Sequence, residues 1–349
     1  MWNKPWTLKE GFIVGAGVVA VGLLLHVCGG PVHWDAFAWP VNGVVLAAFL
    51  LLIGVVYALR RVFSAFRFLS TYAAAVPALA YVVLLTIIMG LTRQTPDGTG
   101  LSNMLSFWPF VLAYAYMTVI LGLVIVQRVS LIVRGRSRRP WWREAGFLLN
   151  HVGLFVAMTT ATLGSADIQR LQMWTTNNPE QAARLFAINM GSENAPQFST
   201  YQYVAYDDQS RPVELPLAVE LKHFVMETYD DGSPRRFASD VVIYSKASSH
   251  KYGATIEVNH PTEVDGWKIY QKSYYLTPLG DACQVSILEL VTDPWLPYVY
   301  AGIFMMLAGA LSMFTMGVKP TPARLSRFAQ QRTPPKGRDL HAGLNSSDI

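Results

Sequence analysis

Six long apolar runs dominate the sequence and restrict the folds open to it. A helix that crosses a bilayer needs about 20 mostly apolar residues, because the hydrocarbon core is about 30 Å thick and a helix rises about 1.5 Å per residue. The runs cover residues 11–27, 41–59, 72–90, 107–126, 146–163 and 296–316. We therefore predict a polytopic α-helical membrane protein with six spans, and we interpret the first run as an uncleaved helix.

The composition agrees with this interpretation. Hydrophobic residues make up 52% of the 349 residues and charged residues only 15%, whereas a soluble domain carries about 25% charged residues. These values disfavour a soluble enzyme and a secreted disulfide scaffold. The two cysteines, Cys28 and Cys283, belong to no CxxC or CxxCH motif, so the chain lacks both a thioredoxin-like pair and a haem-attachment motif of its own.

The basic residues of the short loops predict the orientation. Cytoplasmic loops of membrane proteins carry an excess of Lys and Arg. Fifteen such residues follow spans two, four and six, whereas the other two short loops hold only Arg93. We therefore expect both termini in the cytoplasm, and we do not expect nucleic-acid binding. The loop after span four contributes Arg128, Arg134, Arg136, Arg138, Arg139 and Arg143.

One long hydrophilic stretch, residues 164–293, separates the fifth span from the sixth. Its apolar and polar residues alternate between turn signals, which predicts a mainly antiparallel β domain, with one helix over residues 179–190. Because it follows span five, we expect this domain to be extracytoplasmic. The remaining divisions are an N-terminal membrane region at 1–145, span five at 146–163, span six at 294–317 and a basic, disordered tail at 318–349.

His151 is the ionisable residue that lies deepest in an expected span. It stands about five residues into the fifth span, roughly 7–8 Å past its cytoplasmic end at helical rise, and it shares a face with Phe155, Met158 and Thr162. Ionisable groups are costly in a bilayer and are functional candidates by default. An axial haem ligand fits this setting, and so does a histidine hydrogen-bonded to a neighbouring helix, with Asn150 as a similar polar anchor.

The other histidines give weaker signals. His26 lies near the outer end of span one, where it either ligates a second haem or extends its ring to the interface. His223, His250 and His260 stand singly among predicted strands without metal-ligand spacing, so we interpret them as surface or strand residues.

Three stretches follow one another in a recognisable order. Residues 150–154 lead through 163–167 into the outer domain, residues 265–274 form a strand near its end, and residues 288–295 return to the membrane. In this order and spacing they resemble the ResB (CcsB) family over about residues 146–316. The family usually has about three spans before its outer domain, whereas this chain has five, and spans one to four match only by hydrophobicity.

This resemblance implies a subunit of a cytochrome c maturation complex in the bacterial cytoplasmic (inner) membrane. Such a complex carries haem b to the outer, periplasmic face and presents it for thioether attachment to CxxCH apocytochromes. In the family, a span histidine pairs with one in a CcsA-type partner, and the matching position here is His151. Thiol reduction would belong to separate thioredoxin-like proteins. Arg143, just before span five, is our candidate for screening a haem propionate, and we expect no catalysis by this chain alone.

Two other classes remain open at this stage. A quinol-linked b-type cytochrome needs two pairs of haem-ligating histidines on bundle helices, and only His26 and His151 stand within the expected spans. A haem-free transporter or sensor with an outer β domain is the other alternative. Transporters often show repeated halves, and we find no internal repeat.

Overall fold

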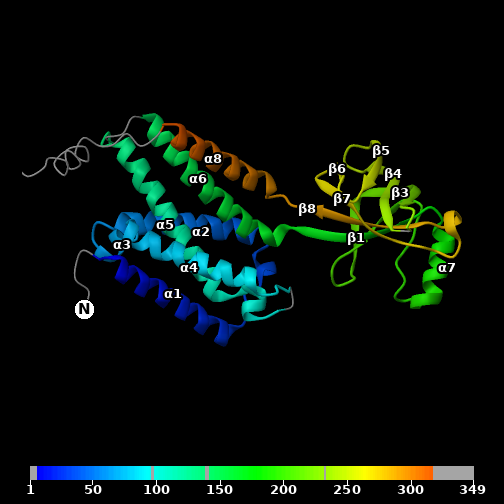
Figure 1. The fold of residues 1–349 in the computed structure, drawn as a ribbon, viewed down its shortest axis with the longest axis horizontal. Coiled ribbons are helices and arrows are strands. Elements are labelled where there is room, and N and C mark those ends of the chain that lie inside the picture. Colours follow the sequence, from blue (N-terminus) through cyan, green and yellow to red (C-terminus); the bar gives the residue numbers. More distant parts are fainter. Residues whose placement is uncertain (1–5, 96–97, 138–140, 232, 317–349) are drawn as a thin grey trace, which may run out of the picture.

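The chain folds into a helical bundle and a β domain that lie end to end and are joined by two strands (Figure 1). The computed structural model describes residues 6–95, 98–137, 141–231 and 233–316. Six helices in this part are long and apolar enough to cross a membrane, as the sequence predicts. They are α1 (Leu8–Gly29), α2 (Val41–Leu59), α4 (Tyr72–Leu91), α5 (Trp108–Val133), α6 (Trp141–Gly164) and α8 (Leu296–Met316).

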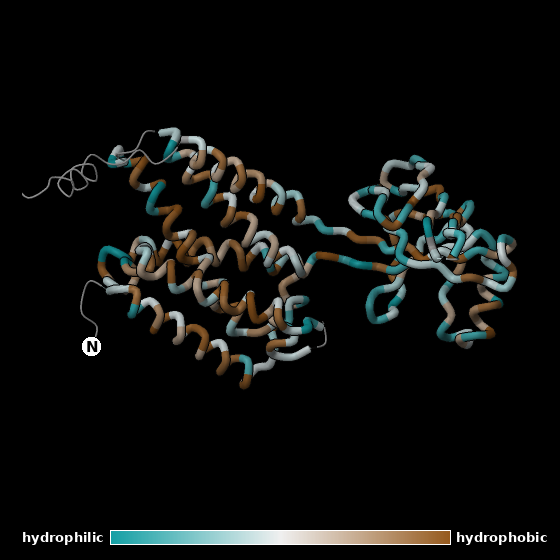
Figure 2. The backbone as a smooth tube through the Cα atoms, viewed as in Figure 1, coloured by the Kyte–Doolittle hydropathy of each residue, from teal (hydrophilic) through white to brown (hydrophobic). Residues whose placement is uncertain are grey.

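Hydrophobic residues are more frequent in the bundle helices, and hydrophilic residues are more frequent in the β domain (Figure 2). Helix α1 packs on α4 and α5, and α6 packs on α8, α5 and α2. We call the end of the bundle next to the β domain the domain end, and the opposite end the far end. The shorter elements of the bundle are η1 (Trp34–Phe37), α3 (Ser64–Phe68), η2 (Gly100–Ser106) and η3 (Ser165–Asp167).

Glycines allow α6 and α8 to approach closely. A Cβ added at Gly153 would lie 2.4 Å from the backbone nitrogen of Met306, and one added at Gly302 would lie 2.5 Å from that of Ala157. Small residues in such positions let two helix backbones pack together in an apolar medium. Asn150 completes this contact, because its side-chain Nδ2 donates a hydrogen bond to the Met306 carbonyl at 3.0 Å.

Two helix boundaries differ from the predicted ones. The apolar run predicted an end near residue 126, but α5 continues to Val133. It stops there because Gly135 adopts a left-handed φ of 62° and the chain closes with hydrogen bonds from Gly135 to Ile132 and from Arg136 to Leu131, a glycine-terminated helix end. Helix α6 is observed from Trp141, five residues before the predicted start.

The β domain is one eight-stranded sheet in the order β5-β4-β3-β2-β1-β8-β7-β6, with every pair antiparallel. Strands β5 and β7 also contact each other although they are distant in this order, so the sheet curls around its core. The strands are β1 (Gln169–Thr176), β2 (Gln202–Tyr206), β3 (Pro212–Thr228), β4 (Pro234–Ser245), β5 (Lys251–Glu257), β6 (Thr262–Val264), β7 (Trp267–Tyr275) and β8 (Val285–Thr292).

Helix α7 (Pro179–Met190) covers one end of the sheet (Figure 1), and its position confirms the predicted helix over residues 179–190. It begins with Asn178, whose side chain accepts a hydrogen bond from the Gln181 backbone, and with a proline in its first turn. Both features are typical of helix starts. A short η4 (Gly280–Ala282) precedes β8. The expected disorder of the tail at 318–349 lies outside the described residues.

Strands β1 and β8 connect the two parts of the molecule. They pair along their whole length, from Gln169 with Thr292 to Thr176 with Val285. Asp167, between α6 and β1, accepts three hydrogen bonds at this junction: from the Trp39 backbone (2.7 Å), from Asn42 Nδ2 (2.7 Å) and from Trp295 Nε1 (2.6 Å). One carboxylate therefore connects α2, α6 and the start of α8.

Candidate functional site

His151 lies on α6 in the half of the helix nearest the far end. It follows Trp141 by ten residues, or about 15 Å of helix. The predicted span placed it about half as deep, because the helix starts earlier than the apolar run indicates. The side chain is half-buried, so part of the imidazole faces the surface of the bundle.

The backbone of α6 fixes the orientation and tautomer of this imidazole. His151 Nδ1 lies 2.9 Å from the carbonyl oxygen of Phe147. A carbonyl can only accept a hydrogen bond, so Nδ1 carries a proton, and in the neutral imidazole Nε2 then carries the lone pair. Across the described residues no hydrogen bond to Nε2 is found. Metal-binding histidines in proteins typically show this pattern, with one ring nitrogen held by an acceptor and the other available.

An aromatic ring and a charged pair lie beside His151. The Phe147 ring stacks on the imidazole with centroids 3.8 Å apart and planes 25° apart. The guanidinium carbon of Arg128, from α5, lies 4.9 Å from the centre of the Phe147 ring. Arg128 also contacts Glu144 through Nε at 3.4 Å. We call Arg128, Glu144, Phe147 and His151 the His151 cluster.

Phe155 and Met158, which share the His151 face, lie where α6 meets α2 and α5. Phe155 stacks on Phe49 of α2 at 6.4 Å, and the Met158 carbonyl accepts a hydrogen bond from the Tyr114 hydroxyl of α5 at 3.3 Å. Both side chains are half-buried, as that of His151 is, so this face is packed in part and exposed in part. The expectation that Phe155 and Met158 lie against a macrocycle stays a prediction.

Asn150 and His151 are neighbours in sequence but face different helices. Asn150 binds α8 through the Met306 carbonyl, which confirms its predicted role as a polar anchor, whereas His151 stands near α5. The structural alternative weighed for His151, a hydrogen bond to another helix, is not what holds it, because its one bonded nitrogen pairs within α6.

His26 occupies the last turn of α1, at the domain end. Its ring makes an edge-to-face contact with Phe107 at 4.8 Å, and its Nδ1 is buried without a hydrogen-bond partner in the described part of the chain. His151 lies toward the far end, on a helix with which α1 makes no major contact. The structure thus does not bring the two histidines together around one iron.

Two arginines, Arg143 on α6 and Arg128 on α5, lie on the far-end side of His151. Arg143, the predicted propionate contact, lies on α6 two turns before His151, about 12 Å along the helix axis. Arg128 reaches the cluster from α5 by way of the Phe147 ring. The sequence assigned Arg128 to a loop because the apolar run ends near residue 126, and Gly135 was the signal that the helix continues past it.

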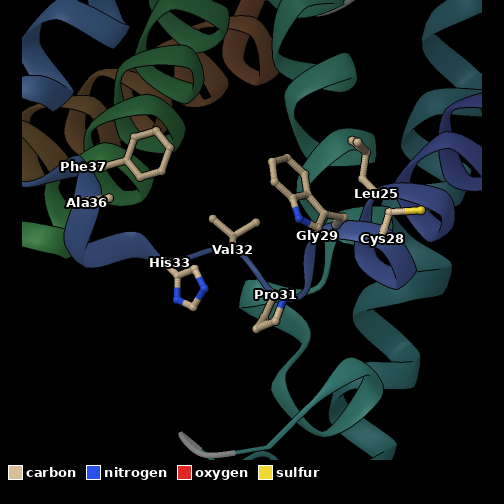
Figure 3. Close-up of a pocket in the computed structure, with 9 residues that line it drawn as sticks. Leu25, Cys28, Gly29, Pro31, Val32, His33, Ala36 and Phe37 are labelled. Carbon is tan, nitrogen blue, oxygen red and sulfur yellow. The ribbon is translucent and has the colours of Figure 1, made fainter.

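Two pockets stand out, and neither is lined by His151. One, of about 430 Å³, lies at the domain end between the end of α1 and the segment that follows it, with Cys28, Val32, His33 and Phe37 in its apolar wall (Figure 3). The other, of about 280 Å³, lies in the β domain beside β3 and is lined by His223, Met226 and Cys283.

The two cysteines are in unlike surroundings and are both free thiols. Cys28 is exposed at the domain end of the bundle, whereas Cys283 is buried in the β domain against α7. Burial raises the pKa of the Cys283 thiol above its ordinary value, which keeps it protonated and unreactive. No group of three or more metal-ligating His, Cys, Asp or Glu side chains occurs in the described parts of the chain.

Comparison with known proteins supports the resemblance seen in the sequence. Residues 136–286 match the family model described as the ResB-like family. The matched segment contains α6, with His151, and the β domain through the start of β8. The resemblance is therefore confirmed for this part of the chain, while α1, α2, α4, α5 and α8 lie outside the match, as do residues 288–295, one of the three stretches that carry the resemblance in the sequence.

No curated protein matches the chain. Among solved structures, one similar chain is titled "Cytochrome c Heme Lyase CcmF". It is 14% identical, and the alignment covers 88% of this chain and 46% of that one, with a TM-score of 0.36. The chain thus spans less than half of that protein, and a TM-score of this size does not establish a common fold.

Proposed function

We propose that the chain is a haem-handling subunit of a cytochrome c maturation complex. In this proposal it holds haem within the membrane, helps to carry it to the outer face, and presents it for attachment to CxxCH apocytochromes. The observation that carries the proposal is His151 Nε2, which has no hydrogen-bond partner among the described residues and lies in a candidate span, inside the segment that matches the ResB-like family.

The hydrogen bond of Nδ1 to the Phe147 carbonyl suits the imidazole to iron. It places the proton of the neutral ring on Nδ1, leaves Nε2 as the ligating nitrogen and restricts the rotation of the ring, so a metal ion meets a ligand that is already oriented. The Phe147 ring is stacked on the imidazole, and an axial imidazole stands perpendicular to the porphyrin, so Phe147 would present an apolar edge to the macrocycle. Haem is the cargo here, bound reversibly between delivery and attachment.

This ligand set is incomplete without a partner. A low-spin b-type haem takes two axial ligands, and the chain offers one at this depth. The other described histidines are His26 and His33 at the domain end of the bundle and His223, His250 and His260 in the β domain. The half-buried His151 ring faces the bundle surface, so a second membrane chain, which we propose to be of the CcsA type, would supply the opposite ligand.

The β domain would act after haem has crossed the membrane. With both termini in the cytoplasm, the sheet would stand on the outer side, connected to the haem-bearing helix through the short η3 and β1. We propose that it forms part of the chamber where haem meets the apocytochrome. Since the described part of the chain has no paired thiols, reduction of the client cysteines would come from a thioredoxin-like protein.

The experiment compares purified wild-type and His151→Ala chains, each co-expressed with the CcsA-type partner. The wild-type complex is expected to show a reduced b-type spectrum, and the variant to lose at least about 90% of its haem by pyridine haemochrome analysis. His250→Ala, on an exposed loop of the β domain, is the matched control and should keep its haem. Equal haem content in His151→Ala and wild type would contradict the proposal.

A further inference from the structure

Arg128 is a cation close to the proposed haem ligand. It stands on α5 five residues before its end, and 23% of its side chain is exposed. Its guanidinium lies 4.9 Å from the Phe147 ring, which in turn lies 3.8 Å from the imidazole of His151. The guanidinium carbon is therefore within about 9 Å of the imidazole centre, on the side toward the far end.

The contact of Arg128 with Glu144 leaves most of the guanidinium unused. Glu144 is 3% exposed, and it meets Arg128 only through Nε, at 3.4 Å. That Glu144 oxygen, Oε2, has no hydrogen-bond partner in the described residues, while Oε1 accepts one from the Ser137 hydroxyl at 2.7 Å. A guanidinium has five N–H donors, and within the described parts of the chain the terminal nitrogens of Arg128 form no hydrogen bond.

Such a guanidinium is suited to a second carboxylate. Its two terminal nitrogens form a planar fork that binds a carboxylate through two parallel hydrogen bonds. Glu144 holds the Nε edge, which orients the fork and reduces the mobility of the long side chain. A haem ligated by His151 carries two propionates at one edge of the porphyrin, several ångströms from the iron, and this edge can be turned toward the far end.

We propose that Arg128 binds a propionate of the haem that His151 ligates, with Glu144 positioning the guanidinium. This inference rests on the proposed function, since it presupposes haem at His151. It gives the haem one orientation, with the propionates toward the far end of the bundle. Arg143 would then be at most a second cation, farther along the same side of α6.

The test compares haemin with haemin dimethyl ester, in which both carboxylates are neutral. Each is titrated into the haem-depleted complex of the full chain with its CcsA-type partner in lipid nanodiscs and followed by its absorption spectrum. The wild-type complex is expected to bind haemin at least about tenfold more tightly than the ester, the scale of a charge-assisted hydrogen-bonded pair. Arg128→Gln should abolish this preference while its affinity for the ester stays unchanged, which shows that the fold and the His151 ligand are intact.

Further variants make the assignment specific. Arg128→Lys keeps the charge but not the fork, so it should retain an intermediate preference. Arg60→Gln is the matched control, because Arg60 also lies at the far end over an aromatic ring, Tyr57, at 4.0 Å; it should behave as wild type. Arg143→Gln measures the other candidate cation in the same assay.

The outcomes separate this inference from the proposed function. If Arg128→Gln keeps the full preference for haemin, or if it binds haemin and the ester equally less tightly than wild type, the role of Arg128 is overturned. The proposed function is not affected by either result. A preference lost in Arg143→Gln and kept in Arg128→Gln would also overturn the role of Arg128. If the wild-type complex binds neither compound, or if the His151→Ala complex binds both as well as wild type, the proposed function itself fails.

Discussion

Asp167 and Trp295 are 128 positions apart in sequence and are joined by a hydrogen bond of 2.6 Å from the indole Nε1 to the carboxylate Oδ2. The first residue ends the segment that leaves the bundle, and the second begins the segment that returns to it. Because Asn42 donates to the same oxygen at 2.7 Å and the Trp39 backbone to the other, the carboxylate fixes the point from which the β domain projects.

Asp167→Asn should loosen this junction. The amide offers one accepting oxygen in place of two, and its NH₂ group would face a donor, so at least one N–H loses its partner at a cost of about 1–3 kcal/mol. We expect the melting temperature of the chain in nanodiscs to fall by several degrees, measured by tryptophan fluorescence. Asp208→Asn, in the exposed turn after β2, is the control and should leave it unchanged. If Asp167→Asn has the melting temperature of the wild-type chain, the junction is held by other contacts.

Gly153→Ala should separate α6 from α8. The added methyl group would lie 2.4 Å from the Met306 nitrogen and 2.6 Å from the Gly302 carbonyl oxygen, and backbone atoms cannot move aside without shifting a helix. We expect a lower melting temperature and a lower yield of folded protein.

The matched control is Gly54→Ala on α2, where an added Cβ meets nothing within 4 Å. Alanine favours helix over glycine, so this variant should be as stable as wild type or slightly more so. If the two substitutions behave alike, the close approach of α6 and α8 does not depend on Gly153.

The β domain should lose stability at both extremes of pH through one pair of side chains. Hydrogen bonds from Lys222 and then Tyr244 lower the pKa of Glu220 below its usual 4.5. Its stabilising contribution is therefore complete above that usual value and is lost as the pH falls through the lowered pKa. Donation to Glu220 raises the pKa of Tyr244 from 10.0 to about 12; the corresponding contribution is complete below 10 and is lost as the pH rises through about 12.

Absorbance of tyrosinate across an alkaline titration measures the Tyr244 part of this prediction. In Glu220→Gln the late-titrating tyrosine should move back toward the ordinary range, and the acid-side loss of stability in thermal melts should shrink. In Tyr244→Phe the late step of the alkaline titration should lose the contribution of one tyrosine, which assigns that contribution to Tyr244. An alkaline titration identical in wild type and Glu220→Gln would show that the two side chains are not coupled in solution.

The sequence predicts the order of the elements well and their ends less well. Apolar length alone identifies each long helix, and alternation identifies the strands, because burial of one face imposes these periods. The end of α5 was missed because residues 127–134 mix polar and apolar side chains. The helix continues past the end of the apolar run, so apolar length alone does not indicate where it stops. Gly135 marked the true end.

Part of the candidate site could also be predicted from the sequence, and part could not. His151 could be found from sequence because an ionisable residue in an apolar run is rare. Helical spacing places Phe147 one turn before His151. The hydrogen bond from His151 Nδ1 to the Phe147 carbonyl also depends on the rotamer of His151, which the sequence does not give. Arg128 could not be placed beside it, because that requires knowing how α5 and α6 pack. The stacking of Phe155 on Phe49 depends in the same way on a third helix, α2.

The most direct measurement of the central claim replaces the imidazole and then returns it in solution. In His151→Gly, co-expressed with the partner, the b-type spectrum should be absent, and adding imidazole together with haemin should restore it in proportion to the imidazole bound, because the small ligand can occupy the space left by the side chain. A His151→Gly complex that shows the wild-type haem spectrum without added imidazole would contradict the claim that His151 ligates the iron.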